Sequence, residues 1–300
     1  MIMNVFFAQF VMLYKMGSLC GIGVAHGTFG ELLQGEYNGS SFLVTLPIAN
    51  KSTAVFIPDK IASEVRGDSV REKARRAVSM FLELHGIQCG GHLSIASNIP
   101  IGKGMASSSA DIVASLRAVA DVYRRPCSAR LISQIACKIE RTDGVMYDGV
   151  VLYNPKNGRL MKKMSVFPPI VLLGIDAGGQ IDTAQFYQTC TGYRLSEQIL
   201  MRQTLQYLLY GVQRQNTAMI FRSATISATI NQRRLQNPYF YTINRLASEY
   251  GGGVVVAHSG TVIGLLLDPK RLHPDEVHHA AQELSQQTGQ KLMIMQRLSW

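Results

Sequence analysis

The sequence predicts an α+β protein of two lobes. Both halves of the chain mix strand-like and helix-like segments, no internal repeat divides it, and 47% of its 300 residues are hydrophobic, enough for a sizeable core. This mixture does not fit a helical bundle or a closed barrel. Turn formers at Pro155, Asn157 and Gly158 mark the candidate boundary between the lobes, so we expect lobes over 22–158 and 159–300.

The first stretch, MIMNVFFAQFVMLYKMG, is apolar and is expected to lie outside the first lobe. It has no basic residue before its apolar run, and it reaches Lys15 after too few residues to span a bilayer, so a secreted or membrane protein is not expected. We therefore interpret 1–21 as an N-terminal extension, with Met16 as the candidate true start. The alternative is a packed first strand.

Four segments of the first half follow the periodicity of regular structure. SFLVTLPIA and STAVFIP are rich in β-formers, and HLSIASNI alternates apolar and polar residues as a half-buried strand does. SARLISQIACKIE gathers its apolar residues on one helical face and begins at Ser128, a favourable N-cap. The first lobe should therefore combine a sheet with helices.

The second half continues the mixture and ends on a strand. Gly251 should end one helix in a left-handed conformation, and Pro274 should lie in the first turn of another. We expect the methionine-rich end, LMIMQRLSW, to pack in the core. The expected elements are a buried strand over 169–176, helices over 195–209, 239–250 and 274–287, two strands within 253–268 that join at Ser259 and Gly260, and a last strand over 291–296.

The formal charge of +10 is compatible with a polyanionic partner, either nucleic acid or a polyphosphate. The densest basic run is VREKARRAV, where Glu72 interrupts the cations and the charges spread around a helical wheel. This pattern favours a solvated helix face formed by Arg71, Lys73, Arg75 and Arg76. Basic and aromatic residues are not interleaved as a nucleic-acid surface would require, so we expect no nucleic-acid partner.

The cysteines indicate a reducing compartment. Their number is odd, they are widely spaced and none forms a C-x-x-C pair, so neither a disulfide framework nor a zinc site is expected. His278 and His279 lie on a predicted helix without a suitably spaced partner, so they are not expected to bind metal. The five cysteines are Cys20, Cys89, Cys127, Cys137 and Cys190.

The segment NIPIGKGMASSSAD, residues 98–111, joins a predicted strand to a predicted helix through a loop of glycine and serine. Ser108 with Asp111 fits a capping box at the start of this helix. A helix N-terminus presents unpaired N–H groups and partial positive charge, so an anion is its natural guest. From Ile112 the apolar stripe of the helix comprises Val113, Leu116, Ala120 and Tyr123.

The composition of this loop favours phosphate as the anion. Glycines let the backbone approach phosphate oxygens, and serine hydroxyls add donors and a neutral ligand for Mg²⁺. A plain turn and cap is the alternative, but it needs only one serine and one glycine. A Walker A loop is excluded because Gly104 follows Lys103. A dinucleotide fingerprint also fits poorly, because Ser107 replaces its third glycine and Asp121 lies inside the predicted helix.

PIGKGMASSSA, residues 100–110, resembles the second motif of the GHMP kinases, with mild departures at Met105 and Ala106. GTFGELLQGEY at 27–37 is similar to the N-terminal motif of that superfamily, and GGGVVVAHSGT at 251–261 lies where its C-terminal glycine-rich motif is expected. Together with ERTDGVMY, these segments are most similar to the L-threonine kinases of cobalamin side-chain synthesis, which have Cys where Phe29 stands. The resemblance implies a two-lobed GHMP-kinase-like fold, with an N-terminal ATP-binding lobe and a C-terminal ferredoxin-like α/β lobe.

The resemblance implies where ATP and Mg²⁺ bind. Mg²⁺, which prefers hard oxygen ligands, would be held by Ser108 and by Glu140 at the end of a helix. Lys103 either contacts phosphate or is a solvated loop lysine. The residues assigned to ATP are Pro100, Ile101, Gly102, Lys103, Gly104, Met105, Ala106, Ser107, Ser108, Ser109 and Ala110.

The resemblance also implies a general base shortly after Glu140. We assign Asp143 to this role, with Asp148 as the second candidate. Ordinary turn chemistry is the alternative explanation, because Asp143 precedes a glycine.

The acceptor is expected to bind at the first motif. Glu31, Gln34 and Gly35 are assigned to it, because a carboxylate suits the ammonium group of an amino acid. A turn anchor is the alternative role for Glu31. His258 and Ser259 are expected to form hydrogen bonds at a strand end rather than to catalyse.

The resemblance therefore implies a cytoplasmic kinase that uses Mg²⁺ and ATP to convert L-threonine into O-phospho-L-threonine. The alternatives are a related kinase for another small hydroxyl compound such as homoserine, a silent nucleotide-binding or regulatory protein, and a nucleic-acid binder. A homodimer is left open as the assembly state.

Overall fold

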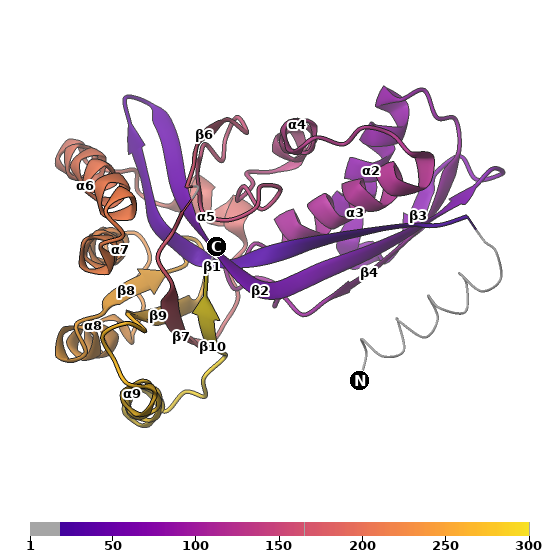
Figure 1. Cartoon of the computed structure of the whole chain (residues 1–300). Helices are drawn as coiled ribbons and strands as arrows, with labels where there is room; N and C mark the ends of the chain where they lie inside the picture. Colours follow the sequence, from indigo (N-terminus) through magenta and orange to yellow (C-terminus); the bar gives the residue numbers. More distant parts are fainter. Residues whose placement is uncertain (1–18, 165, 300) are drawn as a thin grey trace.

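A computed structural model describes residues 19–164 and 166–299 of the chain. Its strands form one continuous sheet in the order β10-β7-β9-β8-β1-β2-β4-β3, and a short ribbon of β5 and β6 branches from β2. Helices α2, α3 and α4 accompany the β1, β2 and β4 end of this sheet, and α6 to α9 accompany the other end (Figure 1). The predicted two-lobed α+β fold is thus confirmed, although the expected extension lies mostly outside the described residues.

The first lobe is built on a long antiparallel hairpin. Strands β1 (Gly21–Tyr37) and β2 (Ser40–Asp59) join through Asn38 and Gly39, which both have positive φ, as two-residue hairpins require. The segments SFLVTLPIA and STAVFIP are parts of the single strand β2. The remaining strands of this lobe are β3 (Val65–Gly67), β4 (Gly90–Ser97), β5 (Val151–Tyr153) and β6 (Leu160–Lys163).

Helix α3 (Ser107–Tyr123) is the centre of the first lobe and is buried on nearly all sides. It lies between the sheet and helices α2 (Glu72–Leu84) and α4 (Ala129–Ile139). The predicted apolar stripe therefore covers only part of the buried surface of α3, because the helix has packing partners on opposite faces. Ser128 caps α4 as predicted, and accepts a hydrogen bond from the Leu131 N–H at 3.2 Å. The short helix η1 (Ser69–Arg71) precedes α2.

Close packing of β1 on α3 depends on glycine, which yields a testable result. A Cβ at Gly23 would lie 2.0 Å from the Ala114 carbonyl oxygen and 2.5 Å from the Ala118 nitrogen, both backbone atoms. Gly23→Ala should therefore lower the free energy of unfolding by about 3 kcal/mol, measured by urea denaturation. Gly192→Ala, where nothing lies within 4 Å, should change it by less than about 0.5 kcal/mol. Equal stability of the two variants would contradict this account.

The second lobe packs helices on strands β7 (Ile170–Asp176), β8 (Gly253–Val256), β9 (Val262–Leu267) and β10 (Ile294–Leu298). Gly251 has φ +61° two residues after the last residue of α8, and Pro274 is the first residue of α9, both as predicted. The methionine-rich end is only partly in the core, because Ile294 and Leu298 are buried whereas Met295 points to the exposed side of β10. The helices are α5 (Thr183–Thr189), α6 (Leu195–Gln213), α7 (Thr217–Asn231), α8 (Phe240–Glu249) and α9 (Pro274–Thr288).

Within the described residues, the pairing of β1 with β8 makes the sheet continuous between the two lobes. The pairing of β1 with β2 shifts register between His26 and Leu33, and in this irregular stretch Glu31 pairs with Val256 of β8. Gly30, with φ +58°, lies directly before this crossing. Strand β1 therefore belongs to both lobes, and the lobe bounds 22–158 and 159–300 stay a prediction.

Candidate active site

The loop between β4 and α3 has an uncommon backbone conformation. Gly102, Gly104 and Ala106 have φ of +74°, +78° and +60°, in the left-handed region that favours glycine. A Cβ at Gly104 would lie 2.4 Å from the Ala257 Cβ and 2.8 Å from the Gly260 Cα. Gly104 thus lets the loop pack against the turn between β8 and β9, so that two of the predicted glycine motifs meet.

The predicted capping box at the start of α3 is wrong. The helix begins at Ser107, so the predicted N-cap Ser108 lies inside it, and Ala106 precedes the helix without a side-chain cap. Asp111 instead accepts a hydrogen bond from the Ser52 hydroxyl at 2.6 Å and pairs with Arg71, although burial raises the pKa of this carboxyl. Asp111 therefore ties α3 to β2 and to the start of α2, and Arg71 does not belong to a solvated face.

A pocket of about 300 Å³ opens at the N-terminus of α3. It brings together these predicted residues: Ile101, Gly102, Gly104, Met105, Ala106, Ser107, Ser108, Ser109, Glu31, Glu140 and Asp143. The predicted Pro100, Lys103, Ala110, Gln34 and Gly35 are not among the residues that line it. The pocket thus joins the glycine loop to the three carboxylates that the sequence predicted.

Glu140 directly follows α4 and reaches the pocket with one unsatisfied oxygen. Its Oε2 pairs with the Lys73 Nζ at 2.5 Å, whereas its Oε1 is buried and has no hydrogen-bond partner among the described residues. A buried carboxylate oxygen without a partner is costly unless a cation or donor satisfies it. Because Mg²⁺ typically takes one or two carboxylates together with water and phosphate oxygens, Glu140 and the nearby Ser108 fit this ion.

Asp143 is the pocket carboxylate with the most strongly altered acidity. Burial, followed by the charges of Glu31 and Glu140, raises the pKa of Asp143 to about 8, against the lowering effects of Ser109 and Arg141. The Ser109 hydroxyl donates a hydrogen bond to its Oδ2 at 3.3 Å. Asp143 can therefore gain or lose a proton near neutral pH.

Asp148, the second candidate base, is exposed and does not line the pocket. A side chain placed there would not reach an acceptor bound beside Glu31 and Asp143. The structure thus favours the first candidate over the second.

Glu31 is held in place by a buried hydrogen-bonded chain. Its Oε2 accepts from the His258 backbone N–H at 3.1 Å and lies 2.9 Å from the His258 Nδ1. The His258 Nε2 lies 2.7 Å from the Ser227 hydroxyl, which accepts from the Gln34 backbone N–H at 3.2 Å. His258 therefore forms hydrogen bonds at the end of β8, as predicted.

Gln34 and Gly35 support the site from outside the pocket. The Gln34 Nε2 donates to the Tyr187 hydroxyl at 2.9 Å, and Tyr187 does line the pocket. Gly35 lies against Phe42 and Met201, so its role is packing between β1 and α6. Gln34 thus acts on the pocket through Tyr187.

Lys103 is not solvated, contrary to one of its two expected roles. Its Nζ pairs with the Asp176 Oδ2 at 2.5 Å and donates to the Gly179 carbonyl at 2.6 Å, which leaves the side chain only 16% exposed. Although burial acts to raise it, hydrogen bonds from Lys103 and Thr261 hold the pKa of Asp176 below its usual value. Contact of Lys103 with phosphate stays a prediction.

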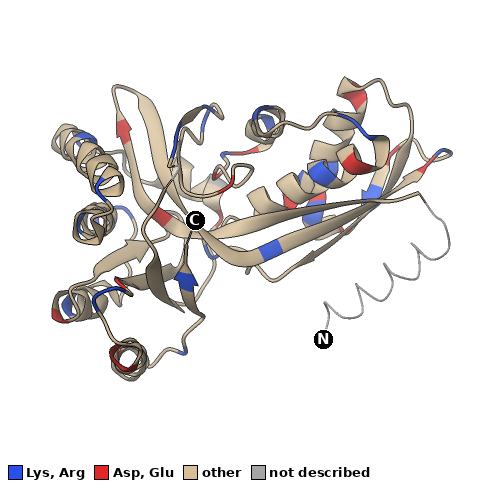
Figure 2. Cartoon of the chain, viewed as in Figure 1, with Lys and Arg blue, Asp and Glu red and all other residues tan. Residues whose placement is uncertain are grey.

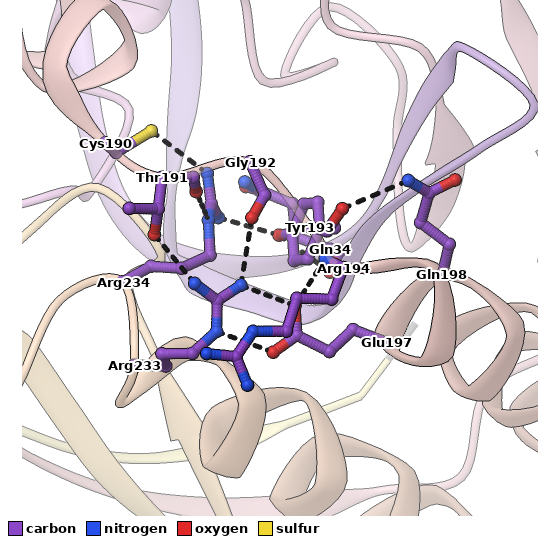
Figure 3. Close-up of polar contacts among 10 residues, drawn as sticks. All are labelled: Gln34, Cys190, Thr191, Gly192, Tyr193, Arg194, Glu197, Gln198, Arg233 and Arg234. Atoms are coloured by element: carbon purple, nitrogen blue, oxygen red, sulfur yellow. Dashed lines mark hydrogen bonds and ion pairs between the residues drawn. The ribbon is translucent and has the colours of Figure 1, made fainter.

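One wall of the pocket comes from residues 177–194, hereafter the wall segment, which sequence analysis missed. Its lining residues are Gln180, Ile181, Asp182, Thr183 and Tyr187. Arg233 and Arg234 anchor its far end (Figure 3). Arg233 donates to the Thr191 hydroxyl and the Gly192 carbonyl, and Arg234 donates to the Thr191 carbonyl, at 2.8 to 3.0 Å. The sequence offered two signals for this wall, Gly178 and Gly179 after a buried strand and the adjacent Arg233 and Arg234. Neither signal indicates which residues they contact.

The remaining polar predictions concern residues away from the pocket. All five cysteines are free, and His279 lies 2.8 Å from the Tyr250 hydroxyl on the outer helices. Lysine and arginine occur on both lobes, interspersed with acidic residues (Figure 2). Within the described residues, no helix has both the length and the apolar character needed to cross a membrane.

The comparisons with known proteins agree with this architecture. Residues 72–150 match the family model of the GHMP kinases N terminal domain. A phosphomevalonate kinase structure from Streptococcus pneumoniae is similar with a TM-score of 0.72, at 12% identity, over 94% of this chain and 99% of that one. Homoserine kinase from Cytophaga hutchinsonii is similar with a TM-score of 0.68, at 17% identity, over 90% and 89%. The fold is thus one used by small-molecule kinases.

Two relatives are similar in sequence over most of their length. The L-threonine kinase of Salmonella typhimurium is 30% identical over 269 residues, which cover 86% of this chain and 86% of that protein. The L-threonine kinase of Citrobacter freundii is 30% identical over 257 residues, or 83% and 86%. The chain belongs to the GHMP kinase family.

Proposed function

We propose that this protein transfers the γ-phosphoryl group of ATP to the hydroxyl of L-threonine, forming O-phospho-L-threonine for cobalamin side-chain synthesis. The observation that carries the proposal is the pocket, which places the glycine loop beside Glu31, Glu140 and Asp143. The two relatives named L-threonine kinase support the choice of acceptor.

The glycine loop and the first turn of α3 would hold the phosphates. No side chain caps this N-terminus, and Ser107, Ser108 and Ser109 line the pocket at this point. The N–H groups and partial positive charge of a helix start favour such an anion. The proposal therefore assigns ATP to residues 100–110, of which Pro100, Lys103 and Ala110 do not line the pocket.

Ser108 and Glu140 would hold Mg²⁺ through their oxygens, and Lys73 would keep the Glu140 carboxylate oriented. When bound, Mg²⁺ and ATP supply the phosphoryl group together with the positive charge that offsets its developing negative charge. The protein contributes position and electrostatics more than covalent chemistry.

Glu31 and Asp143 would act on the acceptor. Glu31, fixed from its buried side by His258, would pair with the ammonium group. Asp143, in its deprotonated form, would accept the proton of the hydroxyl as it attacks. Both carboxylates line the same pocket, so one small amino acid could contact both.

An acceptor panel tests this function. Purified protein with Mg²⁺ and ATP should release ADP chiefly when L-threonine is added, and mass spectrometry should identify O-phospho-L-threonine. L-Serine, L-homoserine and a sample without acceptor are the comparisons. Stronger stimulation by another acceptor would reject the L-threonine assignment, and ATP binding without turnover on any acceptor would favour a silent nucleotide-binding protein.

A further inference from the structure

One cation of the pocket lies in no ion pair within the described residues, although its charge acts on Asp143. Of the two cationic side chains that line it, Lys73 is paired with Glu140, whereas Arg141 forms no ion pair with any described residue. The Arg141 Nε is buried and has no hydrogen-bond partner in the described part of the chain. Because an arginine stays charged and a buried donor without a partner is costly, this group calls for a ligand.

The guanidinium of Arg141 is held in a defined position. Its Cζ lies 3.9 Å from the centre of the Tyr187 ring, so the ring packs against the face of the guanidinium. Stacking of this kind uses the face and leaves the N–H donors at the edge free to bind a planar anion. Arg141 is therefore oriented before any ligand arrives.

The ring that orients Arg141 is itself fixed at several points. Tyr187 accepts a hydrogen bond from Gln34, and the wall segment that carries it is anchored by Arg233 and Arg234 at its far end (Figure 3). At its near end, the Ile181 N–H donates to the Gly102 carbonyl at 3.0 Å. Arg141 thus has a rigid stacking partner on the side where Gln34 and Glu31 lie.

The charges around Arg141 indicate which anion it takes. The phosphates of ATP would lie at the helix start, where the glycine loop and three serines already supply donors. Glu31, which lines the same pocket, offers a negative charge for an ammonium group but nothing for a carboxylate. A free amino acid carries both charges, so the pocket needs a cation near Glu31 in addition to Glu31 itself.

We propose that Arg141 binds the α-carboxylate of the acceptor through its N–H edge, while Glu31 takes the ammonium group. This assignment rests on the proposed function and adds a specificity-determining residue to it. Arginine suits this task because its fork of N–H donors matches the two carboxylate oxygens. The pair of charges would select a free amino acid over an uncharged alcohol.

The test compares L-threonine with L-threoninamide, which keeps the hydroxyl and the ammonium group but lacks the carboxylate. The unchanged protein should have a KM for L-threoninamide about 100-fold higher than for L-threonine, as expected for loss of charge-assisted hydrogen bonds. Arg141→Gln should raise the KM for L-threonine about 100-fold, while the KM for L-threoninamide changes little. The KM for ATP and the melting temperature should stay near those of the unchanged protein.

Two further variants sharpen this test. Arg141→Lys keeps the charge but loses the two-pronged geometry and the stacking, so the KM for L-threonine should rise about 10-fold. Arg214→Gln is the matched control, because Arg214 also stacks on a tyrosine, with its Cζ 5.3 Å from the Tyr210 ring, but does not line the pocket. This control should leave both KM values unchanged.

The outcomes separate this inference from the proposed function. If the protein phosphorylates L-threonine but Arg141→Gln raises only the KM for ATP, or raises both acceptor KM values equally, Arg141 does not bind the carboxylate and the inference falls alone. Another amino acid could be the better acceptor, with a lower KM than its amide in the unchanged protein but not in Arg141→Gln. The L-threonine assignment then falls, while Arg141 keeps its role. If the best acceptor has no carboxylate, both are overturned.

Discussion

Replacing Asp143 with asparagine is expected to lower kcat by about 10²- to 10⁴-fold, the usual contribution of a positioned general base. Asparagine keeps the size of the side chain and its contact with Ser109 but cannot accept the hydroxyl proton. The KM for ATP should change little, because the phosphate loop is not altered. Single-turnover measurements with saturating ATP and acceptor would isolate the effect on the chemical step.

The pH dependence of this variant provides the control. Asp143 faces Glu31, Glu140, Arg141 and Ser109. Burial, followed by the charges of Glu31 and Glu140, raises the pKa of Asp143 to about 8, whereas Ser109 and Arg141 act to lower it. The kcat/KM for the acceptor should therefore rise with pH up to about 8 in the unchanged enzyme, and Asp143→Asn should lose this rise. An unchanged kcat, or the same pH profile in the variant, would exclude Asp143 as the base.

The raised pKa of Asp143 also makes the free energy of unfolding depend on pH. The pKa of Asp143 is higher in the folded than in the unfolded chain, so the stability that its proton provides is present at low pH and is lost as pH rises through about 8. Asparagine does not titrate and escapes this loss. The melting temperature of Asp143→Asn relative to the unchanged protein should therefore increase between about pH 5 and pH 9.

Replacing Glu140 with glutamine should reduce kcat at least about 100-fold and raise the Mg²⁺ concentration needed for half-maximal activity. The carboxylate supplies a negatively charged ligand, and loss of metal-based charge stabilisation costs several kcal/mol in the transition state. The measurement is initial rate against Mg²⁺ concentration at fixed ATP.

A second carboxylate and lysine pair serves as the control for Glu140. The Glu36 Oε2 lies 3.8 Å from the Lys156 Nζ, and neither residue lines the pocket. Glu36→Gln should therefore leave the Mg²⁺ dependence of the rate unchanged. If Glu140→Gln has the same Mg²⁺ dependence as the unchanged protein, the metal assignment is wrong and the unpaired Oε1 needs another partner.

The parts of the fold that the sequence predicted are those set by neighbouring residues. Ser128 caps α4, Gly251 ends α8 and Pro274 opens α9 because each acts within one helical turn of its position. The burial of α3 on nearly all sides depends on contacts with β1, α2 and α4, which no local periodicity reports. For the same reason Asp111 was assigned to a cap although its partners are Ser52 and Arg71.

The candidate site divides in the same way. The glycine loop, Glu140 and Asp143 could be predicted because they belong to contiguous motifs of a known family. Arg141 and Tyr187 could not, because their contact exists only after the wall segment has packed over the pocket. Gln34 was predicted as an acceptor ligand. In the structure it does not line the pocket, and it donates a hydrogen bond to Tyr187, which does.

The crossing of β1 between the lobes also determines when during synthesis the site can form. Glu31 is made early, but its partner His258 follows 227 residues later. Until the chain has been synthesised past His258, the buried Glu31 can pair with β2 but lacks both its β8 neighbour Val256 and its histidine. Such distant pairing slows folding and leaves strand edges open in the nascent chain. The nascent protein should therefore expose open strand edges until β8 emerges, and it should acquire ligand binding only after the segment around His258 has been synthesised.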